Sequence, residues 1–235
     1  MGRGYSKVLT VILVIIIVAV IGLLAYLGYD AYSKYRINKD SQDAVDSFTQ
    51  EVSVETPTGI SDGTGNSIGG NSTGSEEQNL TTEDGNTGSG NTGSSTSGKK
   101  RTYKGFNMLG TIEIPKTNVK YTVLEKVTKK SLETSVAVIY PFENPVLNAV
   151  GNVVIVGHNY RNGVFFSNNK KLSNGDVIYI TDLDGKRVKY TIYKIFEASE
   201  TDASFYNRDT NGKREITLST CTDDSKARLI IQARE

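Results

Sequence analysis

The chain has 235 residues, a formal net charge of +1 and a single cysteine. A charge so close to zero gives no argument for nucleic-acid binding, and a single cysteine excludes an intramolecular disulfide. The sequence contains no CxxC motif, no HExxH motif and no cluster of cysteine and histidine, so we predict no metal site and no cofactor.

An uncharged, mostly apolar stretch runs from Val8 to Leu27. Its length matches the roughly 20 residues that a helix needs to cross a hydrocarbon core about 30 Å thick. A cleaved signal peptide has a shorter apolar region, of about 7–15 residues, and a cleavage site between small residues, which Ala25-Tyr26-Leu27 does not provide. We therefore predict an uncleaved transmembrane signal anchor over residues 8–29, preceded by a short N-terminus of residues 1–7.

Residues 30–102 are predicted to form a low-complexity linker. Residues 30–48 mix charged and apolar side chains and are expected to continue as a helix for a few turns. Residues 49–98 are mainly Gly, Ser, Thr, Asn and acidic residues, without lysine or arginine, so they bury too little apolar surface to offset the entropy of ordering. A disordered coil of about fifty such residues spans roughly 40 Å, which suits a tether.

Residues 103–235 are predicted to form a single all-β domain. Short apolar runs alternate there with turn residues, and helical patterns are few. Many short strands separated by turns are typical of a β-barrel, and about 130 residues suffice for one core. The strands expected are Met108–Ile114, Lys120–Leu124, Val136–Tyr140, a strand ending at His158, Val177–Thr181, Val188–Ile195, Ile216–Cys221 and Arg228–Ala233, with helical segments at Lys129–Ser135 and Val164–Leu172.

The only cysteine, Cys221, ends one of these strands. Side chains alternate along the strand Ile216–Cys221, so the thiol is expected on the polar face with Thr217 and Ser219, within reach of a substrate. Six polar residues then suit a hairpin loop before Arg228, which opens the next strand. Because neighbouring strands lie about 5 Å apart, Cys221 and Arg228 are predicted to lie side by side.

The only histidine, His158, follows Gly157 at the end of another apolar run. A thiol, an imidazole and a guanidinium at strand ends are the minimum set for nucleophilic catalysis by cysteine. Each residue also has a structural interpretation. Cys221 would then be a small buried hydrophobe, His158 a structural residue at a strand end, and Arg228 a solvated surface charge.

The order of these motifs resembles the sortases, the cysteine transpeptidases that attach proteins to the envelope of Gram-positive bacteria. The family's Thr-Leu-x-Thr-Cys strand is matched by Thr217–Cys221, the arginine that opens its next strand by Arg228, and its strand-end histidine by Gly157-His158. The resemblance covers about Gly105 to Glu235. It implies a closed barrel of about eight strands in a single-pass cell-membrane protein, with the catalytic domain outside the cell and the N-terminus in the cytoplasm.

The resemblance also implies roles for individual residues. Cys221 would attack the carbonyl of a Thr-Gly-type bond in a sorting signal and form a thioester. His158 would protonate the leaving amine and then serve as the base for the incoming one, and Arg228 would donate hydrogen bonds to the oxyanion or the substrate backbone. Thr220 matches a position that lines the substrate groove, although it is also an ordinary strand threonine.

The partners implied are sorting-signal peptides of secreted surface proteins, an amine acceptor on a peptidoglycan precursor or a pilin subunit, and the lipid bilayer. The loop Glu197–Lys213 occupies the place where sortases hold the peptide, and its Phe205 and Tyr206 would line that groove or fill the core. The chain has no Asp-Pro-aromatic lid and no large insertion before the cysteine strand. Both housekeeping-like and class D/E-like sortases fit this pattern.

Two other functions use the same sequence features. A thiol endopeptidase would form the same acyl-enzyme and release it to water. A non-catalytic barrel on a flexible stalk would display a binding surface, although it would have no need for Cys221, His158 and Arg228 together.

Overall fold

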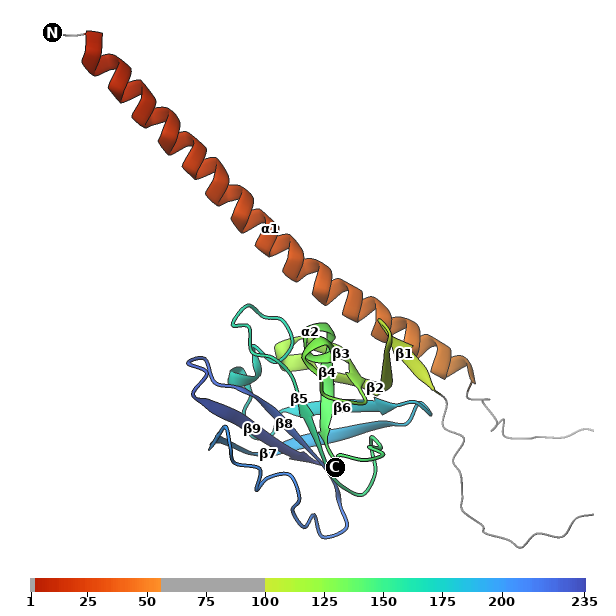
Figure 1. Cartoon of the computed structure of the whole chain (residues 1–235). Coiled ribbons are helices and arrows are strands. Elements are labelled where there is room, and N and C mark those ends of the chain that lie inside the picture. Colours follow the sequence, from red (N-terminus) through yellow and green to blue (C-terminus); the bar gives the residue numbers. More distant parts are fainter. Residues whose placement is uncertain (1–2, 56–99) are drawn as a thin grey trace, which may run out of the picture. The chain divides into compact units, whose positions relative to one another are not determined.

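The computed structural model describes residues 3–55 and 100–235, which form one long helix, a β-barrel and three short helices (Figure 1). Helix α1 is Arg3–Glu55. The strands are β1 (Arg101–Tyr103), β2 (Phe106–Ile114), β3 (Val119–Leu124), β4 (Val136–Tyr140), β5 (Gly151–Val156), β6 (Val177–Asp182), β7 (Arg187–Ser199), β8 (Arg214–Cys221) and β9 (Ala227–Arg234). The short helices are α2 (Lys129–Thr134) and the 3-10 turns η1 (Pro115–Thr117) and η2 (Asn169–Lys171).

Eight strands close the barrel in the order β2-β3-β4-β5-β8-β9-β7-β6, and β6 pairs back onto β2. The short β1 pairs with the first residues of β2. The pairs β3–β4 and β5–β8 are parallel, and the other pairs are antiparallel. Closing the sheet gives each of the eight strands a neighbour on both sides, although β3 and β4 pair at only two residues. The prediction of an all-β closed barrel of about eight strands is confirmed.

Apolar side chains from the strands fill the barrel interior. In β7, Val188, Tyr190 and Ile192 are buried and alternate with exposed neighbours, as expected for a strand with one face in the core. Strand β8 differs, because both of its faces are buried. The hydroxyl of Thr217, on the face predicted to be polar and open, is fully buried and donates a hydrogen bond of 2.8 Å to Asn152 Oδ1.

Some boundaries differ from the sequence-based prediction. Strand β7 pairs with β9 as far as Ser199, so the loop before β8 begins at Glu200 rather than Glu197. Strand β5 ends at Val156, two residues before His158. Only Asn169–Lys171 is helical in the connection to β6, because the preceding aromatic residues fill the core instead of forming a helix face.

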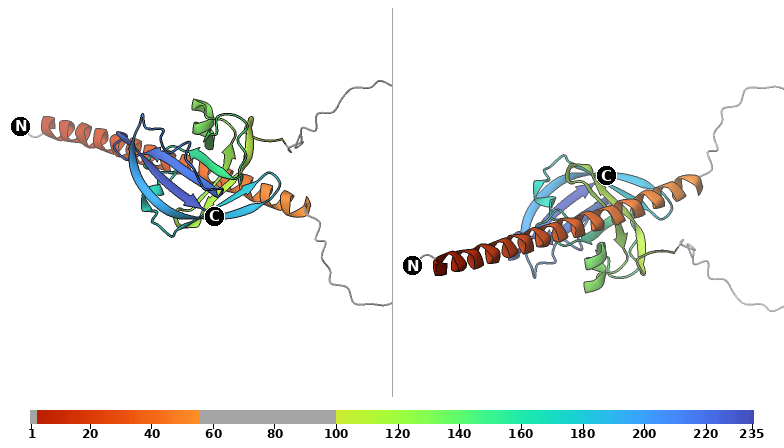
Figure 2. Two further views of the ribbon diagram at one scale, coloured as in Figure 1. Left: turned by 90° about the horizontal axis from the view of Figure 1, so that it is seen from below. Right: turned by 90° about the horizontal axis from the view of Figure 1, so that it is seen from above.

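Helix α1 extends beyond the few turns expected after the apolar segment and ends at Glu55. Its second half packs against the barrel, mainly on β3, and both views in Figure 2 show this part of the helix alongside the strands. The predicted linker of residues 30–102 is therefore too long at both ends. Residues 30–55 belong to α1, and Arg101 and Thr102 belong to β1. The predicted disorder of residues 49–98 is wrong for residues 49–55, which are the end of α1, and residues 56–98 lie outside the described part of the chain.

Candidate active site

Cys221 is the last residue of β8, and its Cα pairs with that of Arg228 at the start of β9. A hairpin loop joins the two strands and is closed by a backbone hydrogen bond of 3.0 Å from Thr222 N–H to the Ala227 carbonyl. The structure thus places Cys221 and Arg228 side by side. The Arg228 guanidinium donates a hydrogen bond to Cys221 Sγ, with an Nη1–Sγ distance of 2.6 Å.

The neighbouring strand β5 brings the histidine to the same end of the barrel. Strands β5 and β8 run parallel, and beyond β5 the Gly157 N–H donates to the Ser219 carbonyl at 3.3 Å. The Thr220 hydroxyl donates to the Gly157 carbonyl at 2.7 Å. A side chain at Gly157 would bring a Cβ within 2.8 Å of Val136 and Phe166, so the close approach here requires glycine.

His158 is half-buried, and its ring stacks on Tyr160 with 4.8 Å between the ring centroids. Burial lowers the pKa of His158 below its ordinary value of 6.5, and the negative charge of Glu133 offsets part of this effect. The imidazole is therefore mainly neutral at neutral pH. A neutral imidazole can accept a proton from a thiol and pass it on.

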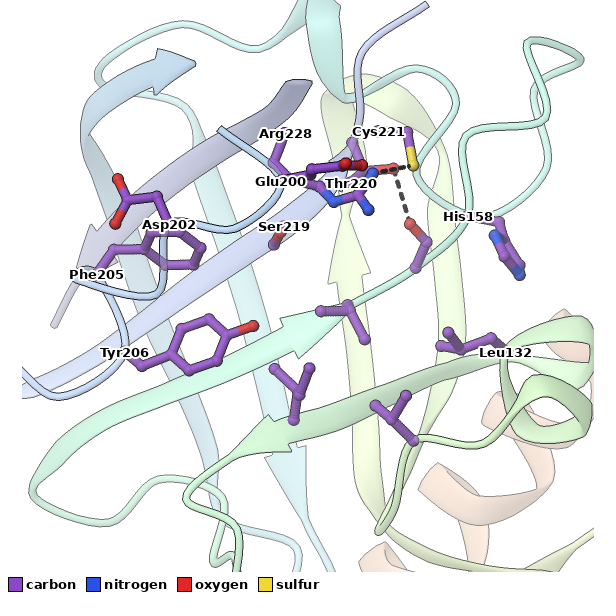
Figure 3. Close-up of a pocket in the computed structure, with 14 residues that line it drawn as sticks. Leu132, His158, Glu200, Asp202, Phe205, Tyr206, Ser219, Thr220, Cys221 and Arg228 are labelled. Carbon is purple, nitrogen blue, oxygen red and sulfur yellow. Dashed lines mark hydrogen bonds between the residues drawn. The ribbon is translucent and has the colours of Figure 1, made fainter. Parts of the chain in front are cut away.

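Cys221, Arg228, His158 and Thr220 all line one pocket of about 290 Å³ (Figure 3). In this view the Arg228 guanidinium and the His158 ring flank the Cys221 thiol. Apolar side chains form much of the remaining wall, namely Val127, Leu132, Ile139, Val156, Phe205 and Tyr206. A pocket with apolar walls and a few convergent polar groups is typical of a binding site for a small ligand or a peptide segment.

The loop between β7 and β8 covers the outer face of β8 and forms one end of this pocket. Asn152 holds the loop by donating to the carbonyls of Phe205 at 3.0 Å and Tyr206 at 2.8 Å. Phe205 is buried against Ala198 and Ile230, whereas Tyr206 is partly exposed. Both aromatic side chains line the pocket, and Phe205 also belongs to the hydrophobic core.

Sequence reasoning missed Asn159, the residue after the histidine. Its side-chain amide donates to the Cys221 carbonyl at 2.9 Å and to Asp223 at 3.0 Å. These bonds tie the segment that carries His158 to the strand that carries the thiol. Nothing in the spacing of Asn159 indicates this contact, because Asp223 lies 64 residues further along the chain.

A second pocket, of about 480 Å³, also opens onto Cys221 and Thr220. It is bordered by Asn159, Lys170 and Glu197 among other residues, none of which lines the first pocket. Two separate spaces therefore meet at the thiol.

Comparison with known proteins gives a consistent picture. Residues 112–235 match the model of the sortase domain family. Sortase A of Bacillus anthracis is 32% identical over 127 residues, which cover 53% of this chain and 58% of that protein. The chain therefore spans little more than half the length of this relative.

Among solved structures, a sortase D5 transpeptidase of Clostridium perfringens is 33% identical, with 54% of this chain and 78% of that chain covered and a TM-score of 0.48. A sortase C of Clostridium perfringens, solved with the C-terminal cell wall sorting motif, is 26% identical, with 54% and 69% covered and a TM-score of 0.48. Because the sortase domain model matches more than half of the chain, this protein belongs to the sortase family.

Proposed function

We propose that the protein is a membrane-anchored cysteine transpeptidase that cleaves a sorting signal in a secreted surface protein and transfers the acyl group to an amine. The acceptor would be a peptidoglycan precursor or a pilin subunit. The observation that carries the proposal is the hydrogen bond from Arg228 to Cys221 Sγ in a pocket that His158 also lines. A thiol, a fixed cationic donor and a neutral imidazole around one pocket suit acyl transfer through a covalent intermediate.

In the first step His158 takes the thiol proton, and Cys221 Sγ forms a bond to the carbonyl carbon of the Thr-Gly-type peptide bond. The carbonyl oxygen becomes an oxyanion, and the Arg228 guanidinium, which carries several N–H donors, stabilises this charge. The C–N bond then breaks as the imidazolium of His158 gives its proton to the leaving amine. A thioester on Cys221 and a neutral imidazole remain.

In the second step the incoming amine attacks the thioester carbonyl and gives a proton to His158. The C–S bond breaks, an amide forms, and the proton returns from His158 to the thiolate. The two pockets that meet at Cys221 support separate approaches for the acyl donor and the amine acceptor.

Membrane anchoring is supported by the first half of α1. All side chains of residues 9–29 are exposed, and apolar ones lie on every side of the helix. A segment of this length and composition is long enough to cross a bilayer. A single crossing with the barrel outside the cell would place the active site where secreted proteins emerge.

The proposal is tested with the full chain in detergent micelles and a panel of Leu-Pro-x-Thr-Gly-like and Asn-Pro-x-Thr-like peptides. Each peptide is incubated with and without glycine or a diamine, and products are identified by mass spectrometry. We expect an amine-dependent ligated product that is absent with Cys221→Ala. Cleavage without ligation would instead indicate a thiol endopeptidase, and no reaction with any peptide would favour a binding barrel.

A further inference from the structure

We propose that α1 is the docking partner of the barrel as well as its membrane anchor, so that a packed helix, and not residues 56–99, sets the distance between the active site and the bilayer. This inference goes beyond the proposed function, because it concerns how the barrel is held and not what it catalyses. In this proposal the docked helix holds the barrel, in place of the flexible tether that the linker composition predicts.

A stripe of buried residues on α1 carries the proposal. Ser41, Val45, Phe48 and Val52 are at most 7% exposed and follow one another at spacings of four, three and four residues. This spacing places them on one face of the helix. Phe48 and Val52 form a hydrophobic cluster with one side chain each from β2, β3 and β4, namely Met108, Leu124 and Ala137.

The two halves of α1 differ in which side chains are exposed, and this difference indicates different surroundings. Residues 9–29 are exposed on every side, whereas residues 37–52 bury one face and keep charges on the others. A helix that is apolar all round suits lipid, and a helix with one apolar stripe suits the surface of a folded domain. One continuous helix therefore passes from the first environment to the second.

Polar contacts surround the apolar stripe. The Tyr121 hydroxyl of β3 donates to Asn38 Oδ1 at 2.5 Å, and the Arg101 guanidinium lies 5.3 Å from the centre of the Phe48 ring. Three acidic residues of α1 pair with three basic residues of the barrel side, in the ion pairs Asp40–Lys104, Asp46–Lys120 and Glu51–Arg101. An apolar centre with a rim of complementary charge is the organisation of a specific interface.

The interface continues toward the candidate active site. The Tyr121 hydroxyl that contacts α1 also accepts a hydrogen bond of 2.9 Å from the Phe165 N–H. The Phe165 ring lies 5.9 Å from that of Tyr160, which stacks on His158. The docked helix thus joins the packing that surrounds the catalytic candidate His158.

The docked helix confines the barrel to the vicinity of the bilayer. From Leu27, at the end of the apolar stretch, to Ile37, which packs against the barrel core, the helix rises about 15 Å. A flexible linker of about fifty residues would allow roughly 40 Å. A barrel held this close favours substrates that are themselves attached to the membrane.

The first test uses membranes that carry the full chain with a protease site inserted within residues 56–99. After cleavage the membranes are sedimented, and the barrel fragment is measured in pellet and supernatant. We expect the barrel to stay in the pellet, because α1 still holds it. Release of the wild-type barrel on cleavage would overturn the proposal.

Matched variants show whether the stripe is responsible. Val45→Asp combined with Phe48→Asp places carboxylates in the interface, so cleavage is expected to release the barrel. Gln50→Asp adds a carboxylate on the exposed face and is expected to keep it in the pellet. Retention of the barrel in the Val45→Asp, Phe48→Asp variant would contradict docking through this stripe.

Cross-linking tests docking independently of the membrane. In a Cys221→Ala chain, Asp40→Cys and Lys104→Cys replace an ion pair 3.2 Å long, and a short bis-maleimide should join the two fragments after cleavage. Lys39→Cys with Lys104→Cys is the control, because Lys39 is exposed and lies about 100° around the helix axis from Asp40. Equal cross-linking of both pairs would overturn the proposal. Failure of the membrane anchor is detected separately, because the uncleaved chain would then not sediment with the membranes.

Discussion

At the scale of single residues, the contact between Arg228 and Cys221 decides what the site can do. Antiparallel pairing of β8 and β9 puts the two Cα atoms opposite each other, and the guanidinium reaches the sulfur. Arginine has several N–H donors in a planar arrangement, so it can contact the sulfur and an oxyanion from one position. A lysine ammonium is a point charge on a flexible stem and lacks this geometry.

We therefore expect Arg228→Lys to lower kcat for peptide ligation by about 10²- to 10³-fold, the usual cost of losing an oxyanion donor. The rate is measured on the full chain with a peptide that the wild type ligates. Lys226→Arg, at an exposed position of the same hairpin loop, is the control and should keep the wild-type rate. Unchanged turnover in Arg228→Lys would remove Arg228 from the oxyanion role.

The protonation of His158 gives a second prediction. Burial lowers its pKa, so the imidazole should titrate with a midpoint below 6.5. His158 is the only histidine, so one C2–H proton signal in the NMR spectrum of an untagged chain reports it directly. Glu133→Gln removes the charge that raises this pKa and should move the midpoint lower still. A midpoint at or above 6.5 would contradict the described environment.

The same shift has a consequence for stability. The folded chain binds the His158 proton more weakly than the unfolded chain does. Protonation of His158 at low pH therefore lowers the free energy of unfolding. The contribution of His158 to the free energy of unfolding is fully present above pH 6.5 and is lost as the pH falls through the lower folded pKa.

At the scale of elements, the strand that carries the thiol was largely predictable. The run Ile216–Cys221 has strand periodicity, and β8 ends at Cys221 as the pattern indicates. The burial of its polar face was not predictable, because it depends on a loop that folds back over β8. Asn152 holds that loop through hydrogen bonds to two backbone carbonyls, and a sequence pattern does not reveal which loop an asparagine will bind.

The second half of α1 was harder to interpret from sequence. Charged residues such as Asp40, Asp43 and Asp46 interrupt the apolar side chains and made residues 30–48 resemble the start of a linker. Val45, Phe48 and Val52 have helical spacing, but their burial depends on a barrel surface more than fifty residues away in sequence. Long-range packing therefore determined the length of this helix.

Helix α2 places Leu132 in the pocket wall, and its start depends on a capping box. The Thr128 hydroxyl accepts from the Ser131 N–H at 3.0 Å, and the Ser131 hydroxyl accepts from the Thr128 N–H at 2.7 Å. We expect Thr128→Ala to lower the free energy of unfolding by about 1 kcal/mol, because it leaves a helix N–H without its acceptor. Urea unfolding measures this loss.

The control for this variant is Thr134→Ala, at the other end of α2. The Thr134 hydroxyl donates only to the Lys130 carbonyl within the helix, so its loss should change stability little. A loss in Thr128→Ala no larger than that in Thr134→Ala would show that the capping box does not stabilise α2.

At the scale of the whole molecule, barrel closure assembles the site from distant parts of the chain. β5 leads to His158, β8 ends in Cys221, β9 begins beside Arg228, and α2 and the loop before β8 close the pocket around them. The three candidate catalytic residues could be chosen from the sequence because Cys221 and His158 are the only residues of their types and Arg228 opens the strand that follows the cysteine. Asn159 could not, since its contact with the Cys221 carbonyl arises only when the segment after β5 lies beside β8.

The measurement that tests the central claim most directly is the intact mass of the protein during turnover. The full chain is mixed with a peptide that it ligates, and the reaction is quenched in acid. The intact mass of the protein is then measured by mass spectrometry. We expect a mass increase equal to the N-terminal peptide fragment, located on Cys221, removed by hydroxylamine and lost when an amine is added. Ligation by the Cys221→Ala chain, or turnover without an adduct on Cys221 when the amine is withheld, would contradict transpeptidation through this thiol.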